Sequence, residues 1–265
     1  MKTADLTYVV RETRTMHPIV RHIEFADLKD AIFKGFADFN AMPTHFVYLA
    51  IIYPIVTFCI AGIYGDLFLL PFVFPLLAGY TLLGPLMAVG TYELSRRREF
   101  GRFTSRANAF LVFKSCSINA VVNLGLVLML IYFAWLFAAQ FIYQQNFGSE
   151  APASYLGFVA DLFTTPEGVA MTVVGCIVGF LFALVVLSFS VVSFPMLLDL
   201  DVGVIAAVKT SIKAVIVNPF IIAIWGVIVA ASLLVGSLPF FAGLCVVLPV
   251  LGHTTWHLYR KIIVS

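Results

Sequence analysis

The chain has 265 residues, of which 62% are hydrophobic and only 11% are charged. Its mean hydropathy of +1.03 excludes a soluble globular domain, in which roughly a quarter of the residues are charged. No nucleic-acid-binding module is recognisable, and the composition indicates the lipid bilayer as the partner. The net charge is only +2, so the distribution of the charged residues along the chain is more informative than their sum.

Six runs without a charged residue are each about 20 residues or longer, which is enough for a helix to cross the ~30 Å hydrocarbon core of a bilayer. They cover residues 46–64, 67–92, 117–143, 169–198, 215–238 and 239–259. We therefore predict an all-α polytopic membrane protein with six transmembrane helices. The first 40 residues carry charges throughout and contain no apolar core, so they are unlike a cleavable signal peptide.

The cations are confined to one side of this predicted bundle. Residues 1–45, 93–116, 199–214 and 260–265 share that side and contain all 16 Lys and Arg. The opposite loops contain only acidic charges, so the net charge divides into +6 and −4. The positive-inside rule then predicts a bacterial inner (plasma) membrane protein with both termini cytoplasmic. Its cytoplasmic anchors are Arg96, Arg97, Arg98, Arg260 and Lys261.

The second and sixth spans repeat one pattern. The motif P-x2-A-G-x5-P-x6-[YW]-x3-R fits residues 75–96 and 239–260 without a gap. Its small residues allow close packing between helices. The packing positions of the two copies are Pro75, Ala78, Gly79 and Pro85, and Pro239, Ala242, Gly243 and Pro249.

An amphipathic segment precedes the first and the fifth span. Apolar residues recur at positions i, i+4, i+8 and i+11, the spacing of one helix face, and a proline follows at the same distance, at Pro43 and Pro219. The two apolar faces consist of Leu28, Ile32, Phe36 and Phe39, and of Val204, Val208, Ile212 and Val215. A weaker copy before the third span contains Ala107, Leu111, Ser115 and Ile118.

These patterns predict three parallel helical-hairpin repeats, each with a cytoplasmic amphipathic helix in front of its two spans. The expected division is a polar tail over residues 1–26 and repeat units over residues 27–98, 99–198 and 199–265. The second unit contains a long outside loop, residues 144–168, with an apolar stretch at 155–163. That stretch predicts a short helix on the outer surface, either a connector or a lid over a cavity.

His253 and His257 lie one helical turn apart near the end of the sixth span. Both imidazoles share a helix face, which a metal or haem site can use, although zinc needs a third ligand. Alignment of the two repeated spans places His257 opposite Glu93, and we predict that these side chains pair across the core. The alternatives are interfacial anchoring beside Trp256 and Tyr259 and a structural hydrogen-bond network, and no cofactor is assigned.

No catalytic arrangement of Ser, His, Asp or Cys is recognisable, and no span carries a charge near its centre. An enzyme is therefore the less favoured class. The sequence leaves a non-catalytic accessory subunit or assembly factor of a larger membrane complex as the first interpretation. A small-molecule transporter or channel is the second, and a metal- or haem-binding membrane protein is the third.

Three motifs carry a resemblance to a known family. They are GYTLLGPLMAVGTYELSRR at residues 79–97, SVVSFPMLLDLDV at 190–202, and NPF at 218–220 with LPVLGHTTWHLYRK at 248–261. The chain resembles an uncharacterised bacterial family of predicted integral membrane proteins, a domain of unknown function, some members of which are labelled as cytochrome c oxidase subunit I-like. With only five histidines, the label implies an accessory or assembly partner of respiratory-complex subunits.

Overall fold

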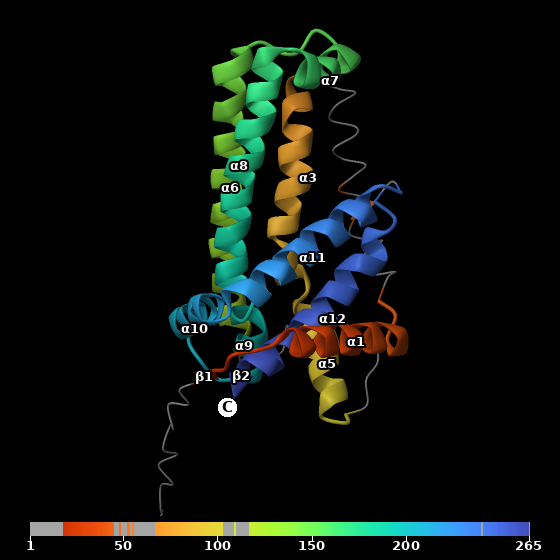
Figure 1. Ribbon diagram of the computed structural model, residues 1–265, viewed down its shortest axis with the longest axis vertical. Helices are drawn as coiled ribbons and strands as arrows, with labels where there is room; N and C mark the ends of the chain where they lie inside the picture. Colours follow the sequence, from red (N-terminus) through yellow and green to blue (C-terminus); the bar gives the residue numbers. More distant parts are fainter. Residues whose placement is uncertain are drawn as a thin grey trace, which may run out of the picture.

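The computed structural model describes residues 18–44, 67–102, 117–239 and 241–264, together with the single positions 48, 52, 53, 55 and 109. These parts are helical apart from one pair of two-residue strands. Two long helices stand side by side along the longest axis, and shorter helices gather at one end of them (Figure 1). The predicted all-α architecture is thereby confirmed.

The first half of the chain contains β1 (Ile19–Val20), α1 (Phe25–Ala41), η1 (Leu67–Phe72), α3 (Val73–Leu82), α4 (Gly84–Met87), α5 (Val89–Glu99) and α6 (Ile118–Phe147). The second half contains α7 (Tyr155–Thr164), α8 (Pro166–Ser190), α9 (Ser193–Asp199), α10 (Val204–Val217), α11 (Pro219–Ser237), α12 (Leu244–Ile262) and β2 (Ile263–Val264).

Three described helical segments are long and apolar enough to cross a membrane. They are α6 with 30 residues, the run from α8 through α9 with 34, and α11 with 19. At about 1.5 Å per residue, the first two exceed the ~30 Å hydrocarbon core and α11 nearly matches it. These three correspond to the predicted third, fourth and fifth spans.

The other predicted spans differ from a single long helix. The first, residues 46–64, lies outside the continuous described ranges. The second is a broken run from η1 to α5, interrupted at Leu83 and Ala88 around Pro85. Proline has no N–H to donate and its ring crowds the preceding turn, so a break at this point is expected. The sixth begins only at Leu244, in α12.

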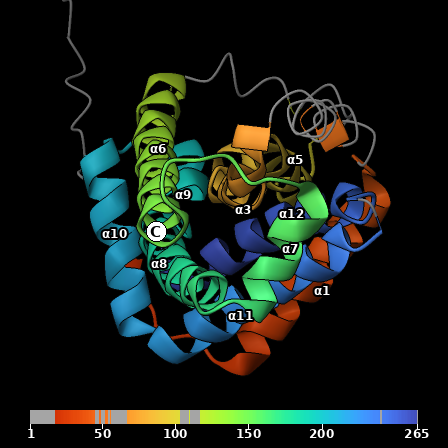
Figure 2. The same ribbon diagram turned by 90° about the horizontal axis from the view of Figure 1, so that it is seen from above.

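The first part of the broken run, η1 and α3, lies along α6, and α5 packs against α12 and α9 (Figures 1 and 2). Trp135 of α6 donates its indole N–H to the carbonyl oxygen of Pro75 at 2.9 Å. A side chain at Gly79 would overlap the ring of Tyr132. Two residues of the repeated motif therefore bring α3 close to α6.

The second copy of that motif begins in a turn. Residues 238–243 connect α11 to α12, and Phe241 has a φ of 63°. A Cβ atom at Gly243 would lie 2.7 Å from the carbonyl oxygen of Gly236, so the two helices meet almost backbone to backbone. Pro239, Ala242 and Gly243 thus shape the turn, whereas their counterparts in the first copy lie inside α3.

The amphipathic helices α1 and α10 are both present, but their buried faces differ from the predicted ones. Leu28 is buried on α1, as predicted. The other buried positions are Ala31, Gly35 and Asp38 on α1, and Ala207, Ser211 and Ala214 on α10. The predicted apolar residues lie mostly at the edges, and Phe36 is 49% exposed. Small residues face inward because the neighbouring backbone is close, and the two sets are related by one offset of 176 positions.

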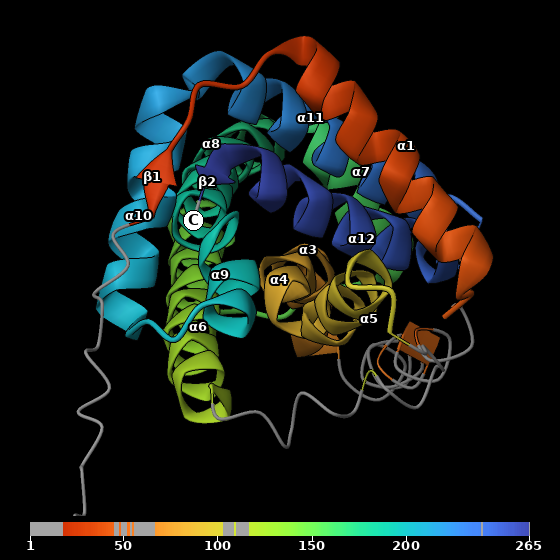
Figure 3. The ribbon, with the colours of Figure 1, turned by 90° about the horizontal axis from the view of Figure 1, so that it is seen from below.

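Helix α1 packs along the outer side of α12 (Figure 3). At Gly35 a Cβ atom would lie 2.8 Å from the backbone nitrogen of Thr254, so only glycine permits this separation. The N-terminal segment is held by Asn218, which accepts the Ile23 N–H at 2.8 Å and donates to the Arg21 carbonyl at 3.0 Å. Strand β1 pairs antiparallel with β2 beside it.

Helix α7 lies at the end of α6 and α8 that is opposite α1 (Figure 1). Ser154 caps it by accepting the Gly157 N–H. Its Phe158 is buried against Tyr143 and Phe147 of α6. The predicted short helix at 155–163 is therefore present.

Candidate functional site

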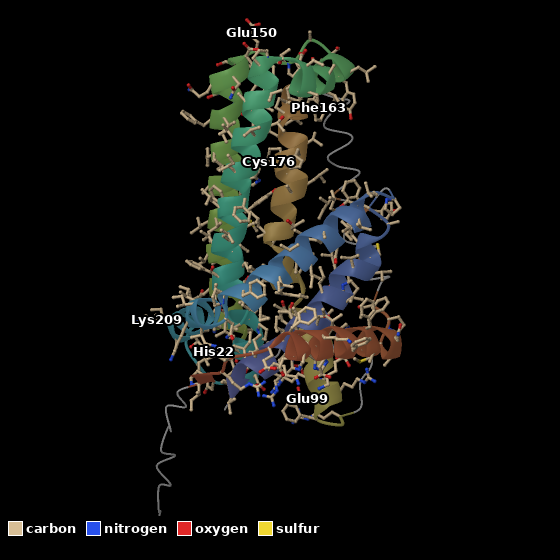
Figure 4. The ribbon with its side chains drawn as sticks, viewed as in Figure 1. His22, Glu99, Glu150, Phe163, Cys176 and Lys209 are labelled. Carbon is tan, nitrogen blue, oxygen red and sulfur yellow. The ribbon has the colours of Figure 1, made fainter. Side chains whose placement is uncertain are left out.

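Polar and charged side chains gather where α1, α5, α9 and α12 meet (Figure 4). The cluster has two centres, the carboxylates of Asp38 and Asp199, and both side chains are less than a tenth exposed. Buried carboxylates are stable only when hydrogen bonds and counterions replace water. The partners of these two groups therefore define what the cluster can do.

Asp38, on the inner face of α1, receives bonds from two other helices. Its Oδ2 accepts from the Ser95 hydroxyl at 2.5 Å and lies 2.8 Å from Nε2 of His257. Its Oδ1 accepts from Nη1 of Arg98 at 2.7 Å. Burial alone would raise the pKa of Asp38, but the bonds from His257 and Ser95 outweigh it and hold that pKa below its ordinary value. Asp38 is thus an ionised link between α1, α5 and α12.

His253 is fully buried one turn before His257. Its Nδ1 lies 2.7 Å from the oxygen of Ser95, whose single hydrogen is donated to Asp38. The serine must then accept the Nδ1–H of His253, a tautomer that leaves Nε2 without a proton. That Nε2 is buried and has no hydrogen-bond partner among the described residues.

The two histidines therefore meet at Asp38, which the sequence did not identify as their partner. The serine hydroxyl and the Arg98 guanidinium also donate to its carboxylate. Within the described ranges, no three His, Cys, Asp or Glu side chains are placed to hold a metal ion. The geometry is that of a buried hydrogen-bond network in which, among the buried side-chain atoms of the two histidines, Ser95 and Asp38, only Nε2 of His253 lacks a partner in the described part of the chain.

Glu93, predicted to pair with His257, has its partners on its own helix. Its carboxylate accepts from Arg96 at 3.0 Å and from Arg97 at 2.9 Å. The structure thus gives Glu93 and His257 separate partners, although both lie in the same cluster.

Asp199, at the end of α9, brings the two copies of the repeated motif together. Its carboxylate accepts from the Tyr259 hydroxyl at 2.8 Å and from Nη1 of Arg260 at 3.1 Å. Nε of Arg96 lies 3.9 Å from its other oxygen. Arg96 and Arg260 occupy the same motif position, so equivalent arginines of the two copies converge on one carboxylate at the end of α9.

The remaining predicted anchors are also paired. Glu99 accepts from Nε of Arg260 at 3.0 Å and from the indole N–H of Trp256 at 2.9 Å. Lys261 lies 2.8 Å from Asp30 of α1, and the bonds to Lys261 and Lys34 lower the pKa of Asp30 to about 2. The basic ends of these helices therefore tie helices to one another.

Small residues allow the helices around this cluster to pack closely. A side chain at Gly252 of α12 would overlap the Thr91 hydroxyl of α5, as one at Gly35 of α1 would overlap Thr254. Because glycine stands at both contacts, α12 lies close to both neighbours. Ser95 and His253 are completely buried as a result.

The sequence missed Asp38, Ser95 and Asp199 as members of the site. Asp38 carries one signal, because it continues the small-residue face of α1 that begins at Ala31 and Gly35. Ser95 lies inside the repeated motif without being one of its shared positions, and Asp199 resembles an ordinary helix end. Their partners come from distant segments, which a single sequence does not reveal.

The long apolar helices, together with a cluster at one end whose charged side chains pair with one another, define the class: an α-helical integral membrane protein. More particularly, residues 73–199, from α3 to the end of α9, match a family described as "Predicted integral membrane protein (DUF2189)". This match confirms the resemblance to an uncharacterised membrane family, and its description says nothing of cytochrome c oxidase. Neither the curated proteins nor the solved structures provide a match.

Proposed function

We propose that this chain is a non-catalytic integral membrane protein that serves as an accessory subunit or assembly factor of a larger membrane complex, with a respiratory complex as one candidate. The observation that carries the proposal is the small buried fraction of α8. In the apolar 18-residue window of the run that contains α8, only 6% of the residues are buried inside the chain, against 28% in the corresponding window of α6.

This difference matters because lipid tails are as apolar as leucine, so burial from water does not drive helices together inside a bilayer. Association there depends on van der Waals packing between complementary surfaces. Helix α8 packs against α6, α7 and α10, but most of its apolar surface makes no such packing within the described part of the chain. A second protein packed along α8 supplies it, over a face formed by Val169, Val173, Ile177, Phe180 and Leu184, all exposed.

The polar cluster supports a structural role over a catalytic one. Its buried carboxylates accept bonds from several donors, as Asp38 does from Ser95 and Arg98. A nucleophile or general base must reach a substrate, but Ser95 and His253 are completely buried. The cluster is suited to hold α1, α5, α9 and α12 in one arrangement.

The six-span, three-repeat organisation belongs to the same proposal. It is supported by the common 176-residue offset between the buried faces of α1 and α10 and by the convergence of Arg96 and Arg260 on Asp199. The placement of this end in the cytoplasm of a bacterial cell is supported by its cations, since the loop that contains α7 has none.

Affinity purification from native membranes tests the proposal. The tagged full-length chain, extracted in mild detergent, is expected to bring down a defined set of membrane proteins by mass spectrometry. Replacing Phe180 and Leu184 with alanine removes side chains from the exposed face of α8, and the partners should be lost. Replacing Phe133 and Phe137, which are exposed on α6, is the matched control and should retain them. Purification of the chain alone, or equal behaviour of both variants, contradicts the proposal.

A small-molecule transporter or channel is the second candidate, because its helices are interrupted. The η1–α5 run breaks at Leu83 and Ala88, and α8 ends at Ser190 before α9 begins at Ser193. Transporters place substrate sites at such breaks. Purified protein in liposomes should then show ion or solute flux that a bulky substitution beside the break abolishes. Liposomes as tight as protein-free ones for protons and small metabolites contradict this candidate.

A further inference from the structure

A groove opens on the outer surface where α10 crosses the base of α6 and α8. It encloses about 360 Å³, within the range of pockets that take small ligands. Its walls are apolar except for one lysine. The lining residues are Leu124 and Val127 of α6, Phe189 of α8, and Val204, Ile205, Val208 and Lys209 of α10.

The groove lies at the position along α6 where polar residues give way to apolar ones. Asn119 and Asn123 lie in its first turns, and Leu124 and Val127 follow directly. A membrane interface is expected at such a change, since polar groups stay with the headgroups. On this criterion the groove lies close to the membrane interface. Lys209 lies on α10 beside the base of α6 and α8 (Figure 4).

The positive charge at the groove has no ion-pair partner among the described residues. Seven other described cations form ion pairs with carboxylates, namely Arg21, Lys34, Arg96, Arg97, Arg98, Arg260 and Lys261. In the described part of the chain, neither Lys209 nor Lys213 forms one, although acidic Asp201 precedes α10 by three residues. The two lysines are one turn apart and share a face. An apolar groove that ends at two unpaired cations fits a molecule with an apolar chain and an anionic head.

We propose that this groove is a binding site for an anionic phospholipid. One acyl chain lies against Leu124, Val127 and Phe189, and the headgroup phosphate pairs with Lys209, with Lys213 adding to the positive field. Ile205, which is 73% exposed, forms the outer wall. The lipid would thereby fix α10 against the base of α6 and α8.

Native mass spectrometry of the full-length protein in mild detergent tests this site. The probes are phosphatidylglycerol and phosphatidylcholine with the same acyl chains. We expect the protein to retain phosphatidylglycerol in preference to phosphatidylcholine by about fivefold, the effect of roughly one cation at an anionic membrane surface. Excess glycerol phosphate, which has the head without the chains, should not displace it.

Two pairs of variants separate the contributions of charge and groove. Lys209→Gln should lower phosphatidylglycerol retention by about fivefold, whereas Lys29→Gln, which removes the same charge from α1, should not. Val127→Trp fills the groove and should abolish retention, while Leu130→Trp, at an exposed position outside the groove, should leave it unchanged.

Equal retention of the two lipids by the unaltered protein overturns the proposal. So does equal retention by Lys209→Gln and Lys29→Gln. Both substitutions are on helix surfaces, so these comparisons remain decisive even if Val127→Trp fails to fold.

Discussion

The substitution Asp38→Asn tests whether the polar cluster holds the helices together. It preserves the shape of the side chain but removes its charge. The carboxylate accepts from Ser95 at 2.5 Å and Arg98 at 2.7 Å and contacts His257 at 2.8 Å, and its side chain is 7% exposed. Loss of the charge therefore affects three contacts between helices at once.

The size of the effect follows from these contacts. Hydrogen bonds to charged groups contribute about 1.5–3 kcal/mol each, and disrupting a buried ion pair costs about 3–5 kcal/mol. Asparagine keeps part of the bonding, and Arg98 is 41% exposed, so water compensates it in part. We expect a loss of about 2–4 kcal/mol in the free energy of unfolding, because the bonds that asparagine keeps and the hydration of Arg98 make the loss smaller than the full sum of the three contacts. For a chain of this size, the corresponding fall in Tm is on the order of 10 °C.

Thermal unfolding of the purified full-length protein in detergent measures this change. Asp30→Asn is the matched control, since Asp30 lies on the same helix and pairs with Lys34 and Lys261 but is 40% exposed. Exposed ion pairs contribute about 1 kcal/mol or less, so its Tm should fall by only a few degrees. Equal shifts for the two variants, or an unchanged Tm for Asp38→Asn, would refute the structural role of the cluster.

Three further outcomes are expected. Gly35→Ala should lower the Tm by several degrees because its Cβ atom would overlap α12, while Gly175→Ala, with nothing within 4 Å, should leave the Tm unchanged or raise it slightly. The lowered pKa of Asp38 implies that the contribution of this carboxylate to stability is complete above the ordinary value of 3.8 and is lost as the pH falls through the lower folded-state pKa. The Tm of the unaltered protein should therefore drop in acid, and the Tm of Asp38→Asn should drop less steeply. Asn218→Ala should release the segment around Ile23, so limited proteolysis should cut there at lower protease concentration than in the unaltered protein.

Much of the fold follows from the sequence because long apolar runs have few alternatives to a membrane helix. The third, fourth and fifth predicted spans therefore coincide with α6, the α8–α9 run and α11. The repeated motif also indicated similar packing of its two copies. It could not show that Pro75 lies inside a helix and Pro239 in a turn, because that difference depends on the contact between Gly236 and Gly243.

The site was harder to predict for the same physical reason. The histidines and the arginines of the repeated motif were recognisable as polar residues at a membrane interface. Their partner Asp38 lies more than 200 residues away in the chain from His253 and His257, and helix periodicity says nothing about which helices meet. The face of α1 was also predicted from its large apolar residues, of which Leu28 is buried, whereas close packing placed Ala31, Gly35 and Asp38 on the rest of the inner face.

Site-specific photo-cross-linking in intact native membranes tests the proposed function most directly. A photoreactive residue at Phe180, which is 62% exposed on α8, should yield a defined adduct with another membrane protein. The same residue at Phe137 on α6 should yield lipid adducts. If Phe180 also yields only lipid adducts, α8 faces the bilayer and the accessory-subunit account is wrong.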